Sequence, residues 1–156
     1  APEHPLVEKL AVQSRRDVVR QVVEASRRER EIDRMSSEVK RLGAPTGAFA
    51  VNPLNGEKVP IWVGDYVLIT YGTGAIMAVP GHDQRDFDFA RQFGLPIREV
   101  IAPPSGPRRD LDMAYIGPGV LVNSGPFDGI DSKTGAERIA DFIEQKRIGK
   151  RSVKYR

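Results

Sequence analysis

The residues with the clearest chemical potential follow a glycine-flanked turn, in the stretch Tyr71-Gly-Thr-Gly-Ala-Ile-Met-Ala-Val-Pro-Gly-His-Asp-Gln-Arg-Asp86. Two carboxylates three positions apart, Asp83 and Asp86, could serve as a general acid and base or as metal ligands. The glycines at positions 72 and 74 would let the backbone approach a ligand whose polar groups meet these carboxylates and Arg85. A tight turn between two strands explains the same glycines equally well.

This stretch does not match the common nucleotide-binding patterns. It lacks the Gly-Lys-Ser/Thr of a phosphate-binding loop, and Met77 stands where a dinucleotide-binding pattern requires glycine. Helix capping is an alternative role for the carboxylates: Asp83 is the expected N-cap, and Asp86 either folds back on that cap or points outward toward a cation. Arg85 is alternatively a solvated helix residue, and His82 a loop residue that forms hydrogen bonds.

The elements that must position these residues follow from hydrophobic spacing and turn residues. Residues 5–42 are expected to be mainly helical, after which the apolar period changes to two. The strands expected after this change are residues 47–51, 58–63, 66–71, 75–79 and 96–101, with a further short strand within 115–122. The pair Asn55-Gly56 predicts a hairpin turn between the first two strands. Helices are expected at residues 84–93, ending at Gly94, and at residues 134–146.

This order of elements predicts an α+β fold with a small twisted β-barrel-like sheet and peripheral helices. The strands follow one another closely, and the nearly continuous apolar run at residues 75–79 is typical of a strand buried on both faces. A length of 156 residues favours a single domain. We expect its residues 1–46 to be mainly helical and residues 47–156 to be strand-rich.

Composition excludes several classes of protein. Without cysteine there is no disulfide framework, thiolate zinc site or cysteine nucleophile, and two histidines are too few for a histidine-rich metal site. No apolar run reaches the length of a membrane span, and we expect a cytoplasmic globular domain. The net charge of +3 suits contact with a polyanion, and residues 145–156 carry several Lys and Arg but no acid. Such a charge run is usually a solvated face, so this basic tail predicts nucleic-acid binding only weakly.

Several segments resemble the editing domain of bacterial leucyl-tRNA synthetases, the insertion called connective peptide 1. They are Thr46-Gly47, Val51-Asn-Pro-Leu-Asn-Gly-Glu-Lys-Val-Pro-Ile-Trp-Val63, the stretch from Tyr71 to Phe87, Gly119-Val-Leu-Val-Asn-Ser-Gly-Pro-Phe127 and Val153-Lys-Tyr-Arg156. The sister isoleucyl and valyl enzymes share the Gly-Thr-Gly turn, whereas the continuation from Met77 to Asp86 is similar to the leucyl form specifically. The resemblance covers nearly the whole chain.

The resemblance implies a post-transfer editing hydrolase with the class I synthetase editing-domain fold. Because a methyl or methylene difference is worth only about 1–3 kcal/mol, such a synthetase needs a second site that cleaves misformed esters. The implied substrates are isoleucyl-, methionyl- and norvalyl-tRNA(Leu), and water is the implied nucleophile. Asp86 would hold the α-ammonium group of the substrate, with Arg85 and Asp83 as further catalytic residues. The residues implied to line the substrate pocket are Leu68, Tyr71, Ile76, Met77, Val79 and His82.

The resemblance also implies the partners of the chain. These are the 3′ acceptor end of tRNA(Leu) with its mischarged aminoacyl-adenosine, and the remainder of a parent synthetase; no cofactor, metal or membrane is expected, and the chain is expected to be a monomer. In the family a threonine-rich peptide precedes the segment that resembles Ala1–Leu6, supplies the other pocket wall and excludes leucine. We expect the chain to lack this peptide, and therefore to bind poorly, hydrolyse slowly or lose discrimination against leucine. The alternatives are a non-catalytic module that binds the tRNA acceptor end, and an inactive fragment.

Overall fold

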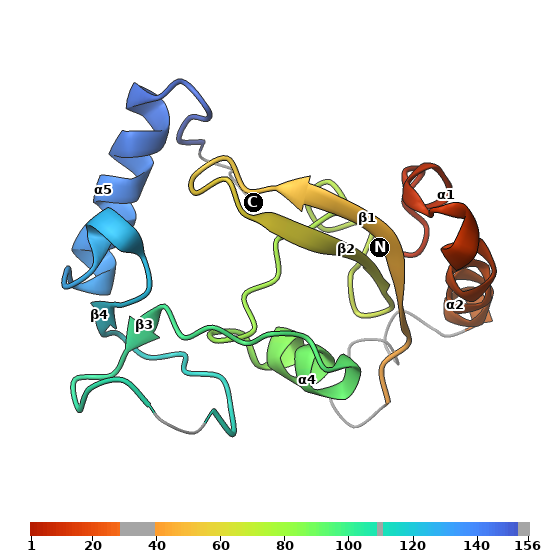
Figure 1. Ribbon diagram of the computed structural model, residues 1–156, viewed down its shortest axis with the longest axis horizontal. Coiled ribbons are helices and arrows are strands. Elements are labelled where there is room, and N and C mark those ends of the chain that lie inside the picture. The colour runs from red at the N-terminus through yellow and green to blue at the C-terminus, as the bar shows by residue number, and fades with distance from the viewer. Residues whose placement is uncertain (29–39, 109–110, 153–156) are drawn as a thin grey trace. The chain divides into compact units, whose positions relative to one another are not determined.

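The chain divides into two compact units, residues 1–78 and 79–156. The computed structural model describes residues 1–28, 40–108 and 111–152. The elements of the first unit are α1 (Val7–Leu10), the 3-10 turn η1 (Gln13–Arg15), α2 (Arg16–Arg28), β1 (Gly43–Val51) and β2 (Lys58–Gly64). Those of the second are α4 (Gln84–Phe93), β3 (Ile101–Ala102), β4 (Val120–Leu121), the 3-10 turn η2 (Gly125–Phe127) and α5 (Ser132–Gln145), as Figure 1 shows.

The first unit contains the predicted hairpin. Strands β1 and β2 pair antiparallel, and their register runs from Gly43 opposite Gly64 to Val51 opposite Lys58. Gly56 donates to the carbonyl of Asn52 at 2.8 Å and has a positive φ of 76°, so the glycine is required by the turn. The hairpin prediction is confirmed, but β1 begins four residues before the expected strand.

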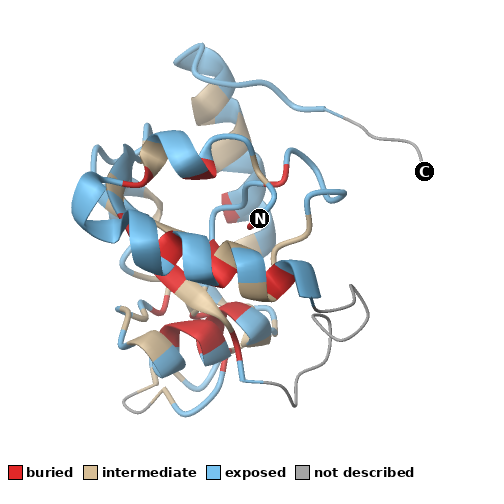
Figure 2. Ribbon diagram, turned by 90° about the vertical axis from the view of Figure 1, so that its right-hand side faces the viewer, coloured by how far each residue is buried: buried red, intermediate tan, exposed pale blue. Residues whose placement is uncertain are grey.

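The helices of this unit pack against the hairpin. Val7, Ala11, Val19, Val22, Ala44 and Val63 form its hydrophobic core. The buried residues of α2 are Val19, Val22 and Ser26, and their spacing of three and four places them on one side of the helix (Figure 2). Of the long helical region expected over residues 5–42, the part from 29 to 39 lies outside the described residues.

Two predicted strands are wrong. Residues 66–71 form successive tight turns, in which Val67 donates to the carbonyl of Gly64 and Tyr71 to that of Leu68. Residues 75–79 belong to neither sheet, and every one of them is exposed. The apolar character of residues 75–79 therefore did not indicate burial, because among the described residues no neighbouring strand pairs with them.

The second unit is built from helices and a small strand pair. Helix α4 has the predicted bounds, with Asp83 as N-cap and Gly94 in the left-handed conformation at its end. Phe89 and Phe93 pack with their ring centroids 4.6 Å apart, as their spacing predicts. Strands β3 and β4 pair antiparallel. The strand expected at residues 96–101 is reduced to β3, and α5 begins two residues earlier than expected.

The fold is α+β, with small antiparallel sheets. Each unit holds one two-stranded sheet, and the described residues contain no closed barrel. The barrel-like sheet therefore stays a prediction. Among residues 1–28, 40–108 and 111–152, no helix is long and apolar enough to span a membrane.

Candidate active site

The predicted site residues fall into both units. Leu68, Tyr71, Ile76 and Met77 belong to the first unit, and Val79, His82, Asp83, Arg85 and Asp86 belong to the second. The first group is apolar or aromatic and the second, apart from one valine, is polar.

The apolar group lies on turns and extended chain at the end of the first unit. Tyr71 is 67% exposed and Met77 is 63% exposed. Gly74, with φ of 76°, donates to the carbonyl of Tyr71 at 3.0 Å, and its own carbonyl accepts from the N-terminal ammonium of Ala1 at 2.7 Å. A Cβ at position 74 would lie 2.5 Å from Cδ1 of Ile69, so both the conformation and the close packing favour glycine there.

The polar group is organised around the beginning of α4. Oδ1 of Asp83 accepts from the backbone N–H of Arg85 at 2.9 Å and of Asp86 at 3.3 Å. These bonds satisfy two of the amides that have no partner inside the helix. The Arg85 guanidinium lies 3.4 Å from Oδ2 of the same carboxylate. The capping role proposed from the sequence for Asp83 is therefore present in the structure.

The surroundings of Asp83 favour its charged form. Burial raises the pKa of this carboxyl, but the hydrogen bond from the Arg85 side chain, the backbone N–H of Asp86 and the positive charge of Arg85 together lower it. The net result is a pKa below the ordinary value of 3.8. Asp83 is thus an anion at neutral pH and remains one well into the acid range.

Asp86 is the buried carboxylate of the site. It occupies the first turn of α4 with only 6% of its surface exposed. Its Oδ2 accepts from the backbone N–H of Val79 at 2.7 Å, and the carbonyl of Val79 accepts in turn from the N–H groups of His82 and Asp83. A charge-assisted bond to a buried carboxylate is short and strong, so residues 79–86 close into a compact loop around Asp86.

His82 is surrounded by backbone groups. Its Nδ1 lies 2.8 Å from the carbonyl oxygen of Tyr115, and its Nε2 accepts from the N–H groups of Val100 at 3.0 Å and Ile101 at 3.1 Å. The role as a loop hydrogen-bonder, raised from the sequence as an alternative, matches these contacts. A contact with substrate stays a prediction.

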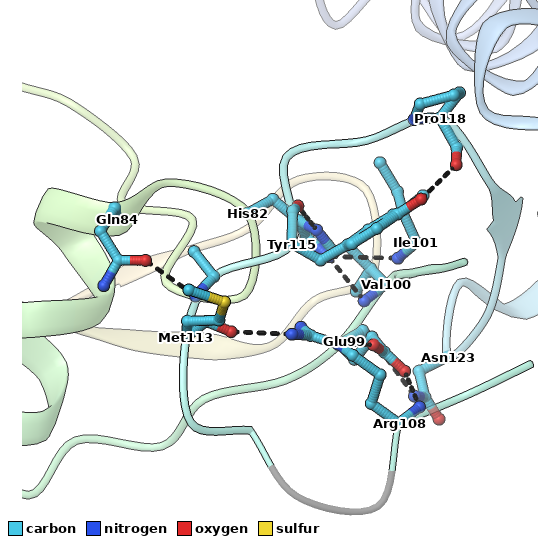
Figure 3. A network of polar contacts seen from close by, with 11 residues as sticks. His82, Gln84, Glu99, Val100, Ile101, Arg108, Met113, Tyr115, Pro118 and Asn123 are labelled. Atoms are coloured by element: carbon cyan, nitrogen blue, oxygen red, sulfur yellow. Dashed lines mark hydrogen bonds and ion pairs between the residues drawn. The ribbon is translucent and has the colours of Figure 1, made fainter. Parts of the chain in front are cut away.

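Four residues near this site were not anticipated from the sequence: Gln84, Glu99, Arg108 and Tyr115. Figure 3 shows them with His82 in one polar network. The buried Glu99, 7% exposed, accepts from Nε of Arg108 at 2.7 Å, and Nη1 of that arginine donates to the carbonyl of Met113 at 2.8 Å. Glu99 lies in the strand expected over residues 96–101 and Arg108 in the proline- and glycine-rich stretch that follows, and neither carries a signal that could have identified the pair.

A hollow beside the C-terminal part of α4 does not include Asp86. It has a volume of about 650 Å³ and is lined by Ala90, Arg91, Gly94, Leu95, Ile97, Leu111 and Asp112. At 1.5 Å per residue, Gly94 lies about 12 Å along the helix axis from Asp86. Among the described residues, no group of three or more His, Asp or Glu side chains is arranged to hold a metal ion.

Comparison with known proteins gives these features a family. Residues 1–144 match the family model "Leucyl-tRNA synthetase, editing domain". The leucine–tRNA ligase of Rubrobacter xylanophilus is 51% identical over 156 residues, which are 100% of this chain and 19% of that protein. The leucine–tRNA ligase of Gloeobacter violaceus is 52% identical over 157 residues, 100% of this chain and 18% of that protein.

A solved structure gives the same result. The agnB2 LeuRS of Agrobacterium radiobacter K84, in a ternary complex with tRNA and LeuAMS, is similar with a TM-score of 0.69 and 29% identity, covering 99% of this chain and 16% of that one. The chain thus spans about a fifth of the length of its relatives. On these matches, the chain belongs to the family of leucyl-tRNA synthetase editing domains.

Proposed function

We propose that residues 1–156 form one editing domain that hydrolyses the ester bond of mischarged tRNA(Leu). The observation that carries the proposal is Asp86, a buried carboxylate held by a backbone amide in a chain of this family. The wider proposal follows from the family: a cytoplasmic monomer with a barrel-like editing fold, acting on the tRNA 3′ end beside the rest of a synthetase.

In this proposal Asp86 binds the α-ammonium group of the misattached amino acid. A carboxylate is the group that pairs most strongly with an ammonium group, and that of Asp86 is already oriented by the backbone N–H of Val79. A cation and an anion brought together away from water attract strongly, which would fix the direction of the ester. Asp83 and Arg85 would support this arrangement by holding the first turn of α4.

The reaction proposed is ester hydrolysis by water. The water oxygen bonds to the ester carbonyl carbon, and the bond from that carbon to the ribose oxygen breaks. One proton of the water goes to the ribose oxygen and the other is released to solvent, so the amino acid leaves as its carboxylate and the tRNA with an intact hydroxyl. The proposal needs no covalent enzyme intermediate and no metal.

The apolar residues would supply selectivity. Tyr71, Ile76 and Met77 are exposed and chemically suited to contact an adenine ring or an aliphatic side chain. We propose that these three residues and Leu68 contact the terminal adenosine or the amino acid, and that Val79 is a substrate contact of the second unit. Isoleucyl, methionyl and norvalyl esters are the proposed substrates.

Deacylation assays test this proposal. Purified chain is incubated with isoleucyl-tRNA(Leu) and leucyl-tRNA(Leu), both alone and as part of a full-length leucyl-tRNA synthetase. We expect faster loss of the isoleucyl ester, and a decrease of about 100-fold in Asp86→Ala, the effect typical of a misplaced substrate. Asp88→Ala is the matched control, because Asp88 is on the same helix but exposed.

The outcomes separate the two classes of function. A binding module would hydrolyse nothing and would retain its affinity for tRNA in both Asp86→Ala and Asp88→Ala, and this affinity would fall steeply with salt concentration. Absence of ester hydrolysis in both the isolated chain and the full-length enzyme would overturn the proposal. Equal losses in Asp86→Ala and Asp88→Ala would remove Asp86 from its proposed role.

A further inference from the structure

His82 connects three backbone segments of the second unit. Its ring joins the turn before α4 to Tyr115 through Nδ1, and to Val100 and Ile101 through Nε2 (Figure 3). The backbone N–H of Tyr115 also donates to the carbonyl of Gly81 at 2.9 Å. The turn at positions 81 and 82 is therefore bonded to residue 115 twice.

The bonds of the ring assign its protonation. A backbone N–H can only donate, so Nε2, which faces two of them, must carry a lone pair and no proton. The ring is then neutral with its proton on Nδ1, which donates to the carbonyl oxygen of Tyr115. Both nitrogens are thus used by the protein itself.

The same turn holds Asp86. The N–H groups of His82 and Asp83 bond to the carbonyl of Val79, and the N–H of Val79 bonds to Asp86. Position 81 has no room for a side chain, because a Cβ there would lie 2.4 Å from the carbonyl oxygen of Arg98. One residue beyond the cap, Oε1 of Gln84 accepts from the N–H of Ala114 at 3.0 Å.

We propose that His82 is a positioning residue for Asp86: through its neutral, Nδ1-protonated ring it fixes the turn whose Val79 amide holds that carboxylate, and it does not bind substrate. This inference rests on the proposed editing function for its activity readout, and on the structure alone for its other readouts. It replaces the substrate contact predicted for His82 from the family resemblance.

Two variants separate the two ring nitrogens. His82→Gln can place an amide oxygen near the position of Nε2 and still accept from Val100 and Ile101. His82→Asn can place an amide NH₂ near the position of Nδ1 and still donate to Tyr115. His82→Ala removes both groups. Because His82→Asn and His82→Ala leave two backbone N–H groups without an acceptor, we expect them to be more damaging than His82→Gln.

Three measurements on the whole chain do not depend on activity. Imidazole ¹⁵N shifts should show the Nδ1-protonated neutral form. Hydrogen exchange at Val100, Ile101 and Val79 should be faster by about tenfold or more in His82→Ala and largely restored in His82→Gln. His4→Ala is the matched control, since the ring of His4 accepts a local bond from the backbone N–H of Leu6 in the other unit; this variant should leave the three amides unchanged.

The activity test is a double-mutant cycle with Asp86→Asn. If His82 acts through Asp86, His82→Ala slows ester hydrolysis about tenfold in the wild-type background and adds little in the Asp86→Asn background. Full additivity, or ring ¹⁵N signals that shift when a non-hydrolysable aminoacyl-adenosine is added, would make His82 a substrate ligand and overturn the inference. An Nε2-protonated ring, or unchanged exchange at Val79 in His82→Ala, would overturn it as well.

Failure of the proposed function gives a different pattern. In that case the wild-type chain hydrolyses no ester, whereas the ring ¹⁵N shifts and the exchange at Val79 still report whether His82 fixes Asp86.

Discussion

Helices α4 and α5 begin in the same way, but only the beginning of α4 buries a second carboxylate. Asp83 caps α4 through the N–H groups of Arg85 and Asp86, and Asp131 caps α5 through those of Lys133 and Thr134. Three residues after the cap, α4 carries Asp86, which is buried, whereas α5 carries an exposed threonine.

The difference lies in what stands behind each helix. The turn before α4 is braced by His82, and Glu99 and Arg108 hold the segment around Met113 that bonds to Gln84. At the beginning of α5, Ser132 exchanges two bonds with Gly119, from N–H to carbonyl and from N–H to hydroxyl. An aspartate N-cap is therefore no indication of a site by itself, and the buried charge beside it is the distinguishing feature.

The largest expected effect on stability comes from removing the ion pair between Glu99 and Arg108. Glu99→Ala leaves the half-buried guanidinium of Arg108 without its carboxylate, and breaking a buried ion pair typically costs about 3 kcal/mol or more of unfolding free energy. Urea unfolding measures this loss. Glu99→Gln keeps the shape of the side chain and one acceptor, so it should lower the unfolding free energy less. If Glu99→Ala were as stable as the unsubstituted chain, the ion pair would contribute nothing to stability.

Removal of the caps sharpens the comparison directly. Asp83→Ala should lower the unfolding free energy by about 1 kcal/mol through loss of the N-cap bonds, and should also slow ester hydrolysis, since Asp86 follows it in the same turn. Asp131→Ala should lower the melting temperature without slowing hydrolysis. Equal slowing in both variants would indicate that helix stability alone controls the site.

Acid should affect both caps in the same direction. Hydrogen bonds from the side chain and backbone of Thr134 lower the pKa of Asp131, as Arg85 and the α4 amides lower that of Asp83. A depressed carboxyl pKa adds stability above its unfolded value, here 3.8, and this stability is lost as pH falls from there through the folded pKa. Asp83→Asn and Asp131→Asn should each weaken the decrease in melting temperature below pH 3.8. If the melting temperature of either variant fell with pH as steeply as that of the unsubstituted chain, the lowered pKa of that aspartate would be contradicted.

The smallest expected effect is at the far end of α5. Arg151 folds back on Glu137, Asp141 and Glu144 with N–O distances of 3.3, 2.7 and 2.6 Å, and all four side chains are exposed. Hydrogen bonding to Asp141 raises the pKa of the arginine, but solvent and salt screen such pairs. Arg151→Ala should barely change the melting temperature, in contrast to Glu99→Ala, and Lys150→Ala is its matched control. A large change in tRNA affinity in Arg151→Ala would favour the binding module.

Short-range patterns predicted much of the fold. The Asn-Gly hairpin, the Asp83 cap and the end of α4 at Gly94 each depend on residues within a few positions, so local steric and hydrogen-bonding preferences decide them. The exposed run at residues 75–79 was predicted wrongly, because apolar character alone does not specify a pairing partner. The start of β1 was also missed, since Gly43 pairs with Gly64, on the far side of the hairpin.

The candidate site shows the same division. By itself the sequence determined which residues could carry the chemistry and which of them cap a helix, because side-chain type and spacing along one chain are local facts. Only the tertiary structure decided that Asp86 is buried and that His82 bonds to residues 18, 19 and 33 positions away. Those partners are brought together by the packing of separate segments, and burial and hydrogen bonding across such distances depend on the whole second unit.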